Sequence, residues 1–310
     1  MSNPGAMALR PASPVAIRWP AAVAIAVAVL SGCGPAGPGS PAASSLVAAT
    51  SSAAAGGTAS PSTGLSSEPV GVAVIGHSGA TGYNSDPDRP GEDAEENSWA
   101  TGTNPDVQSL YLRLLAQDPS VKGHNINIAI DGSDIKRLVV EAAQLVQRDP
   151  PPKLILVQTI DNDIRCDGTD DANLEPFGAD LSTALETLSS HLPTSKIFVV
   201  SQWATVKAYD KVVFALSPSH LQGDGPCDPV DPATGKIVAS KEAYLQGLVD
   251  KYWAVVTRVC GTFASCRTDG GAMQAMDLVA ADLSSDYNHL SIAGHAKMAA
   301  MEWAALDATN

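Results

Sequence analysis

A serine, an aspartate and a histidine stand in this chain where they could form a nucleophilic catalyst. Ser78 lies three residues after the end of the apolar run at 70–75, and near the other end of the chain Asp286 and His289 lie three residues apart. A serine hydroxyl is a poor nucleophile at neutral pH and needs an adjacent base that is held in the correct tautomer. One turn of chain can place the Asp286 carboxylate against Nδ1 of His289, which leaves Nε2 to face Ser78. We expect these residues to form a catalytic triad.

Attack by such a serine on a carbonyl also requires hydrogen-bond donors for the oxyanion that develops. The candidates are the backbone amides of Ser78 and Gly132 and the side-chain amide of Asn162, because each residue follows an apolar segment. Gly132 has no Cβ and would let a substrate approach the backbone closely. We expect these three residues to form an oxyanion hole.

Apolar runs and helical patterns alternate through the chain from residue 70 onward. Strands are predicted at residues 70–75, 125–130, 154–159 and 197–201, with a short last strand at 278–280. Helices are predicted at about 134–147, 179–191, 241–259 and 292–306. Such alternation indicates an α/β fold with a parallel sheet covered by helices on both faces. Ligand sites of these sheets lie at the carboxyl ends of the strands, where the candidate residues would meet.

The ordered set of Ser78, Gly132, Asn162 and the pair of Asp286 and His289 resembles the SGNH hydrolases, also called the GDSL esterase and lipase family. The resemblance covers residues 70–310 and implies a three-layer, flavodoxin-like α/β fold. It also implies hydrolysis of carboxylic esters through an acyl-enzyme, with no metal and no organic cofactor.

Residue by residue, the resemblance implies that Ser78 is the nucleophile, that His289 is the base and that Asp286 orients it. Gly132 and Asn162 match the oxyanion donors of the family. An acyltransferase with the same triad, or an envelope-binding lipoprotein without turnover, remains an alternative.

Two positions depart from the family pattern. His77 stands where the first block has aspartate, and Ile160 stands where the third block has glycine. Neither departure removes a catalytic group, but each alters a loop. We expect His77 to make a local hydrogen bond, with a role as auxiliary base as the alternative. Residues 76–80 also resemble the nucleophile elbow of α/β-hydrolases. The elbow serine normally follows several earlier strands, whereas Ser78 follows the first predicted strand of the domain, which favours the SGNH family.

The N-terminal part of the chain has the features of an export signal. An apolar run at residues 19–30 follows two arginines and has the length of a signal-peptide hydrophobic region. It leads into Leu-Ser-Gly-Cys, which resembles the bacterial lipobox, in which the cysteine, here Cys33, is acylated. We expect a lipoprotein signal peptide at 1–32, although an ordinary signal peptide is the alternative. The protein would then be exported and lipid-anchored on the outer face of the cell membrane.

The segment that follows Cys33 is composed almost wholly of Ala, Gly, Pro, Ser and Thr. It shows no hydrophobic period and cannot bury enough surface to offset the entropy of ordering. We therefore expect residues 33–69 to be the lipidated cysteine and a flexible tether, and residues 70–310 to be the esterase domain.

The remaining cysteines are even in number, which in an exported chain indicates two disulfides. We favour Cys260 with Cys266, which closes a short loop and leaves Cys166 with Cys227. Zinc ligation is the alternative, but no Cys-x-x-Cys pair is present. A disulfide at Cys166 would fix the loop that carries Asn162.

The charge balance restricts the partners of the protein. The chain has 33 acidic and 19 basic side chains and a formal net charge of −14, which would repel nucleic-acid phosphates. Six of the acids lie in residues 83–104, and we expect a solvated acidic loop there, with a lid or an oxygen-ligand cation site as alternatives. The expected partners are an acyl-ester substrate and, through Cys33, a membrane; nucleic acid is not expected, and the protein should be a monomer.

Overall fold

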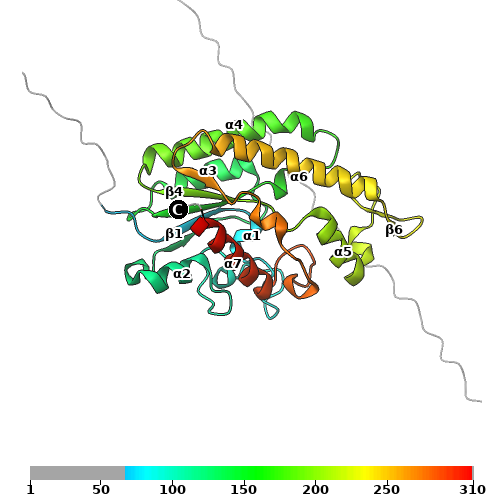
Figure 1. Ribbon diagram of the computed structural model, residues 1–310, viewed down its shortest axis with the longest axis horizontal. Helices are drawn as coiled ribbons and strands as arrows, with labels where there is room; N and C mark the ends of the chain where they lie inside the picture. The colour runs from blue at the N-terminus through cyan, green and yellow to red at the C-terminus, as the bar shows by residue number, and fades with distance from the viewer. Residues whose placement is uncertain (1–66, 309–310) are drawn as a thin grey trace, which may run out of the picture. The chain divides into compact units, whose positions relative to one another are not determined.

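The computed structural model describes residues 67–308 (Figure 1). The predicted signal peptide, Cys33 and all of the predicted tether except its last residues lie outside this range. Within residues 67–308, no helix is both long enough and apolar enough to cross a membrane.

The centre of the fold is a parallel sheet with the strand order β2-β1-β3-β4-β7. Its strands are β1 (Val72–Gly76), β2 (Asn125–Asn127), β3 (Leu154–Gln158), β4 (Lys196–Val200) and β7 (Cys266–Thr268). All residues of β1 and β3 are buried, as expected for strands covered on both faces, which read as continuous apolar runs. The sequence therefore predicted four of the five strands of this sheet, which are β1 to β4.

The predicted last strand at residues 278–280 is wrong, because the fifth strand is β7. Val279 is 46% exposed, and its backbone amide donates to the Asp282 carboxylate at 2.9 Å. This local hydrogen bond folds the segment into a 3-10 turn, Ala280–Asp282, instead of pairing it with a neighbour. A run of three apolar residues was too short a signal to separate the two outcomes.

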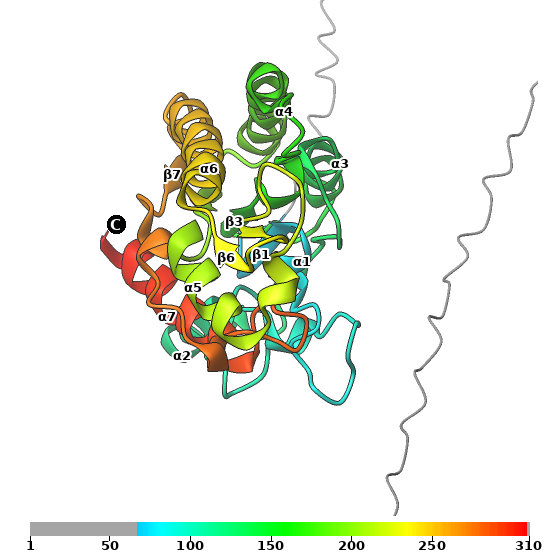
Figure 2. The same ribbon diagram turned by 90° about the vertical axis from the view of Figure 1, so that its right-hand side faces the viewer.

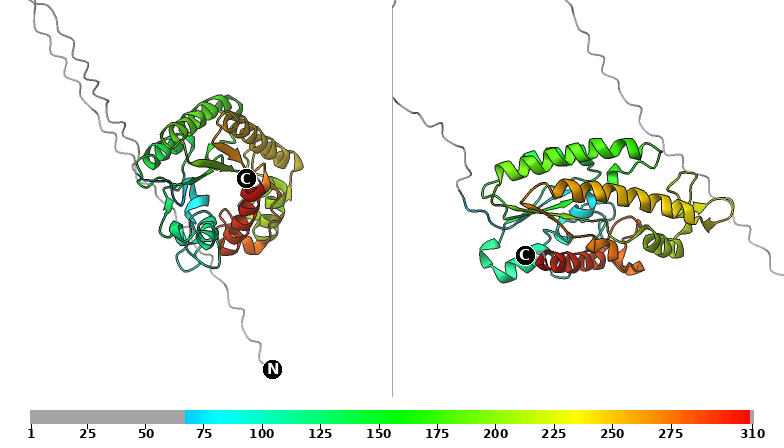
Figure 3. Two further views of the ribbon diagram at one scale, coloured as in Figure 1. Left: turned by 60° about the vertical axis from the view of Figure 1, so that its left-hand side comes forward. Right: turned by 45° about the horizontal axis from the view of Figure 1, so that its top comes forward.

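Helices cover both faces of the sheet and form three layers (Figure 2; Figure 3 shows them from two further sides). One face carries α3 (Ile135–Leu145), α4 (Asp170–His191) and α6 (Ala239–Cys260). The other carries α2 (Leu110–Gln117) and α7 (Ile292–Ala308), with α5 (Val206–Leu216) beside them. Alternate residues of each strand enter the two cores, as for Ile75 and Val74 in β1. This architecture is the three-layer α/β fold that the sequence predicted.

The helices α2 and α5 were not predicted, and α4 begins earlier than expected. The predicted start at residue 179 missed the first turns of α4, where Asp170 and Asp171 lie and which contain Pro176. Acidic residues in a first turn are stabilised by the helix dipole. The helical pattern could be recognised only beyond the proline.

The acidic segment, residues 83–104, exposes most of its acidic side chains, as expected of a solvated loop, but other residues of the segment are buried. Trp99 is fully buried, and its indole Nε1 donates to Oε1 of Gln158 at the end of β3 at 3.0 Å. Ser98 is also fully buried and donates to the carbonyl of Ala80 at 2.6 Å. The acids remain outside, where Arg89 pairs with nearby carboxylates. The segment is thus anchored in the core by its apolar residues.

The structure contains two disulfides, Cys166 with Cys227 and Cys260 with Cys266, which is the pairing that the sequence favoured. The second joins the end of α6 to β7. Because these four thiols are oxidised, they cannot ligate zinc. Among residues 67–308, no group of three or more His, Cys, Asp or Glu side chains is placed to hold a metal ion, so the cation site considered for residues 83–104 has no support.

Candidate active site

Ser78 begins the short helix α1 (Ser78–Thr81) directly after β1. The strand ends in Gly76, whose φ of +142° is a conformation that side chains rarely adopt; a Cβ there would lie 2.1 Å from the carbonyl oxygen of Gln158. Nδ1 of His77 then caps α1 by accepting from the amide of Gly79 at 3.1 Å. The tight exit from β1 and this cap together hold the Ser78 hydroxyl at the carboxyl edge of the sheet.

The structure brings Ser78, His289 and Asp286 together in one hydrogen-bonded chain. Nε2 of His289 lies 2.9 Å from Oγ of Ser78, and Nδ1 of His289 lies 2.7 Å from Oδ2 of Asp286. The backbone amide of His289 also donates to Oδ1 of Asp286 at 3.0 Å. This arrangement can remove the serine proton while the carboxylate stabilises the resulting imidazolium.

The Asp286 carboxyl is held in its charged form. Its partial burial acts to raise its pKa, but the hydrogen bonds from Ser284 and His289 outweigh this and lower the pKa to about 2. Oγ of Ser284 donates to Oδ1 at 2.7 Å, and the amide of Asn288 donates to the same oxygen at 2.9 Å. The residue therefore remains a carboxylate at any pH at which the enzyme would work.

The acidic segment contacts the His289 loop, which the sequence did not reveal. The ring of Tyr83 lies 4.7 Å from the imidazole of His289, centroid to centroid. Nδ2 of Asn84 donates to Oγ of Ser284 at 3.2 Å, and Ser284 in turn donates to Asp286. These contacts join residues about 200 positions apart, and neither residue type nor spacing could have indicated them.

Of the three expected oxyanion donors, Ser78 and Asn162 line the pocket beside the triad and Gly132 does not. Nδ2 of Asn162 donates to the carbonyl of Ser133 at 3.0 Å, which ties the loop after β3 to the turn that carries Gly132. Gly132 has a φ of +69°, but a Cβ there would meet nothing within 4 Å. Glycine is thus suited to this turn by its backbone angle and not by crowding.

Ile160, which replaces the expected glycine, keeps a backbone conformation that suits glycine. Its φ is +99°, and its side chain is only 1% exposed, in the core between the sheet and α3 and α4. A positive φ is an outlier for a β-branched residue and is a form of strain found near functional sites. The burial of the side chain offsets this strain, so the loop that carries Asn162 forms without the glycine.

His77, which replaces the expected aspartate, forms a second polar pair with Asp161. Burial and the nearby His289 lower the pKa of His77 to about 4, so the ring is neutral. Because Nδ1 accepts from Gly79, the proton lies on Nε2, which faces Oδ2 of Asp161 at 3.2 Å. His77 thus has no free nitrogen to act as an auxiliary base. Sequence reasoning singled out His77 but did not assign a role to Asp161.

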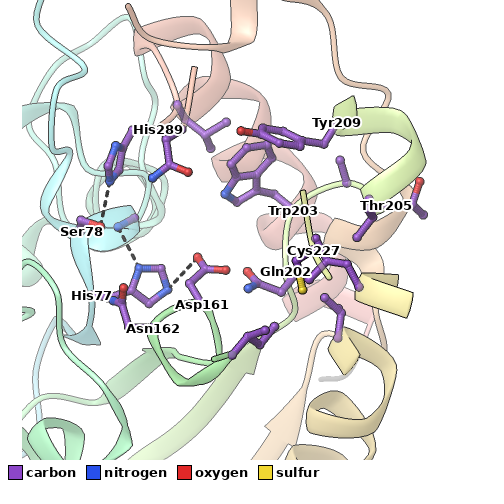
Figure 4. Close-up of a pocket in the computed structure, with 18 of the residues that line it drawn as sticks. His77, Ser78, Asp161, Asn162, Gln202, Trp203, Thr205, Tyr209, Cys227 and His289 are labelled. Atoms are coloured by element: carbon purple, nitrogen blue, oxygen red, sulfur yellow. Dashed lines mark hydrogen bonds and ion pairs between the residues drawn. The ribbon is translucent and has the colours of Figure 1, made fainter. Parts of the chain in front are cut away.

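A pocket of about 350 Å³ opens beside Ser78 and is drawn in Figure 4. Part of its wall is apolar and consists of Ile164, Val206, Leu245, Val249 and the disulfide of Cys166 and Cys227. The polar part of the wall includes Asp161, Gln202, Trp203 and Asn288. Desolvation in the pocket raises the pKa of Asp161 to about 7, although its side chain is 39% exposed.

One family model and several solved structures are similar to this chain. The model of a family described as GDSL-like Lipase/Acylhydrolase matches residues 72–301. Among solved structures, the chain is similar to a family 3 carbohydrate esterase from Clostridium thermocellum, with 15% identity, a TM-score of 0.46, and 76% of this chain and 94% of that chain covered. An extracellular lipase from Streptomyces rimosus has 12% identity and a TM-score of 0.46, with 78% and 100% covered.

A phospholipase A1 from Streptomyces albidoflavus has 11% identity and a TM-score of 0.45, with 78% of this chain and 100% of that chain covered. No curated protein matches the chain.

Proposed function

Because the chain belongs to the GDSL-like lipase and acylhydrolase family, we propose that it is a serine esterase that hydrolyses carboxylic esters through an acyl-enzyme. The observation that carries this proposal is the unbroken hydrogen-bonded chain from Asp286 through His289 to Ser78, which ends at a pocket of about 350 Å³. A serine hydroxyl bonded to a charge-stabilised imidazole is the nucleophile that acyl transfer requires.

In the proposed reaction, Nε2 of His289 takes the proton of Ser78 as Oγ attacks the carbonyl carbon of the ester. His289 then gives this proton to the departing alcohol, and the acyl group remains on Ser78. A water molecule, deprotonated by His289, attacks the acyl-enzyme and releases the acid. The proton returns to Ser78, so the enzyme is restored and one ester bond is cleaved for each water consumed.

The oxyanion of each tetrahedral intermediate would be stabilised by the backbone amide of Ser78 and by the side chain of Asn162, whereas Gly132, the third expected donor, does not line the pocket. The Asn162 amide has two N–H donors, and only one is used on the carbonyl of Ser133. The second is free to serve the oxyanion while the first keeps the loop in place.

We further propose that the protein is exported and anchored to the outer face of the cell membrane through Cys33. The support from the described residues is the presence of two disulfides, because such bonds persist in oxidising compartments outside the cytosol. Esters of envelope or extracellular lipids or glycans would then be its substrates.

Labelling with a fluorophosphonate probe tests the nucleophile. We expect the full chain to be labelled and to hydrolyse a short-chain ester, and we expect Ser78→Ala to abolish both. Ser190→Ala is a matched control, because Ser190 is an exposed residue of α4 and does not line the pocket. Labelling that persists in Ser78→Ala would refute the assignment. An unlabelled wild-type protein would favour a binding lipoprotein, and an acylated product formed with an added sugar would favour acyl transfer.

A further inference from the structure

Several polar groups that face the pocket have no role in the triad and have unused hydrogen-bonding capacity within residues 67–308. Only one oxygen of the Asp161 carboxylate faces a protein group, His77. Gln202 is 8% exposed, and its side-chain amide makes no hydrogen bond within residues 67–308, nor does the indole N–H of Trp203. Figure 4 shows these three side chains around the space opposite Ser78. The Gln202 amide and the Trp203 indole lie at the pocket surface, where a ligand can complete their hydrogen bonds.

The hydrogen-bonding capacity of these groups selects the chemistry of that ligand. Asp161 can only accept while it is ionised, the Gln202 amide both donates and accepts, and the Trp203 indole donates. An alkyl chain would leave all of them unsatisfied. A hydroxyl group both donates and accepts, and the Trp203 ring offers a flat apolar face beside it. The set therefore fits a group with several hydroxyls.

Charge excludes an anionic ligand at the same place. The lining residues, all from the described part of the chain, include no lysine or arginine. A phosphate or carboxylate would therefore find no counter-charge from a lysine or arginine there. A lipid headgroup with a phosphate next to the ester is thus disfavoured relative to a neutral polyol.

The departure from the family at His77 places a neutral ring beside the Asp161 carboxyl group. Nδ1 of His77 is fixed by the amide of Gly79, and Nε2 lies 3.2 Å from Oδ2 of Asp161 without a hydrogen bond between them. The Asp161 carboxyl group therefore keeps its hydrogen-bonding capacity for a ligand.

We infer that Asp161, Gln202 and Trp203 form a subsite for a polyol, such as a sugar, that is part of the ester substrate. This inference rests on the proposed esterase function and names its substrate class. The subsite lies in the same pocket as Ser78, so the hydroxyl-bearing group would be held beside the ester bond.

The test compares the butyryl esters of a hexose, of hexan-1-ol and of choline, which share their acyl group. We expect kcat/KM for the hexose ester to exceed that for the hexyl ester by about 10-fold or more. The hexyl group has no hydroxyls and would lose the hydrogen bonds to the subsite. Asp161→Asn and Gln202→Leu should each lower this ratio, mainly through KM. Asp167→Asn, a change at an exposed carboxylate in the same loop, should leave the ratio unchanged. A preference for the hexyl or choline ester would overturn the inference, as would a ratio that the two pocket variants leave unchanged.

Binding to the Ser78→Ala protein separates the subsite from turnover. Calorimetry with the intact hexose ester should show binding that Asp161→Asn weakens about 10-fold. If all esters are hydrolysed and depend on Ser78 but show no preference, the esterase stands and the subsite fails. If no ester is hydrolysed but the hexose ester binds through Asp161, the subsite stands and the esterase fails. No binding of the hexose ester overturns the subsite.

Discussion

Removal of the Cys166–Cys227 disulfide should weaken both stability and activity, whereas removal of Cys260–Cys266 should weaken stability alone. The first disulfide lies in the pocket wall and holds the loop after β3, on which Asn162 lies. The second joins α6 to β7, away from the pocket. The two double serine variants therefore remove the same chemistry from different places in the fold and serve as matched controls for each other.

The expected loss of stability follows from the length of chain that each disulfide closes. The partners are separated by 61 residues in the first case and by 6 in the second. The entropy of loop closure in the unfolded chain gives about 4 kcal/mol for the longer loop and about 2 kcal/mol for the shorter. At about 2–4 °C for each kcal/mol in a domain of this size, Tm should fall by roughly 8–16 °C and 4–8 °C.

Calorimetric unfolding of the three proteins and kinetics on a short-chain ester measure both effects. We expect the Cys166→Ser, Cys227→Ser variant to have the lower Tm and, below its unfolding range, a lower kcat, because the loop that carries Asn162, the proposed oxyanion donor, is no longer held by the disulfide. The Cys260→Ser, Cys266→Ser variant should keep its kcat. The reasoning is refuted if the variant without the Cys166–Cys227 disulfide keeps full activity. It is also refuted if loss of the Cys260–Cys266 disulfide lowers Tm as much as loss of Cys166–Cys227.

Two buried residues near the site give further predictions. Burial raises the pKa of Glu141 from 4.5 to about 7, so the folded state binds its proton more tightly, and this stabilisation is present below pH 4.5 and lost as the pH rises through 7. From pH 5 to pH 8 the unfolding free energy of the wild type should therefore fall by about 2–3 kcal/mol relative to that of Glu141→Gln. Urea unfolding of both proteins across this pH range measures the effect. A difference in unfolding free energy that does not change with pH would contradict the raised pKa of Glu141. The Ile160→Gly variant should have a free energy of unfolding about 0.5–1 kcal/mol higher than that of Ile160→Ala, because φ is positive at this position. At most positions the alanine variant would be the more stable. Equal unfolding midpoints for Ile160→Gly and Ile160→Ala would show that the backbone relaxes.

Much of the fold could be predicted because buried parallel strands have a strong local signature. The runs at β1 and β3 are apolar, and α3 has the spacing of apolar residues that is typical of an amphipathic helix. The short last strand was misplaced, because β7 contains Arg267 and Thr268 and becomes a strand only by pairing with β4. The burial of Trp99 could not be predicted either, because the composition of residues 83–104 indicates a solvated segment and does not show that single residues in it are buried.

The sequence by itself determined which residue types could form the site and their order along the strands. Ser78, Asp286 and His289 were identified because the chemistry of a serine nucleophile prescribes its partners, and because the carboxyl ends of parallel strands share an edge. Only the tertiary structure decided which side chains surround them. The contact of Tyr83 with His289, the pairing of His77 with Asp161 and the free amide of Gln202 depend on distances across the sheet edge. Such distances are set by the packing of whole layers, which no local pattern of residues encodes.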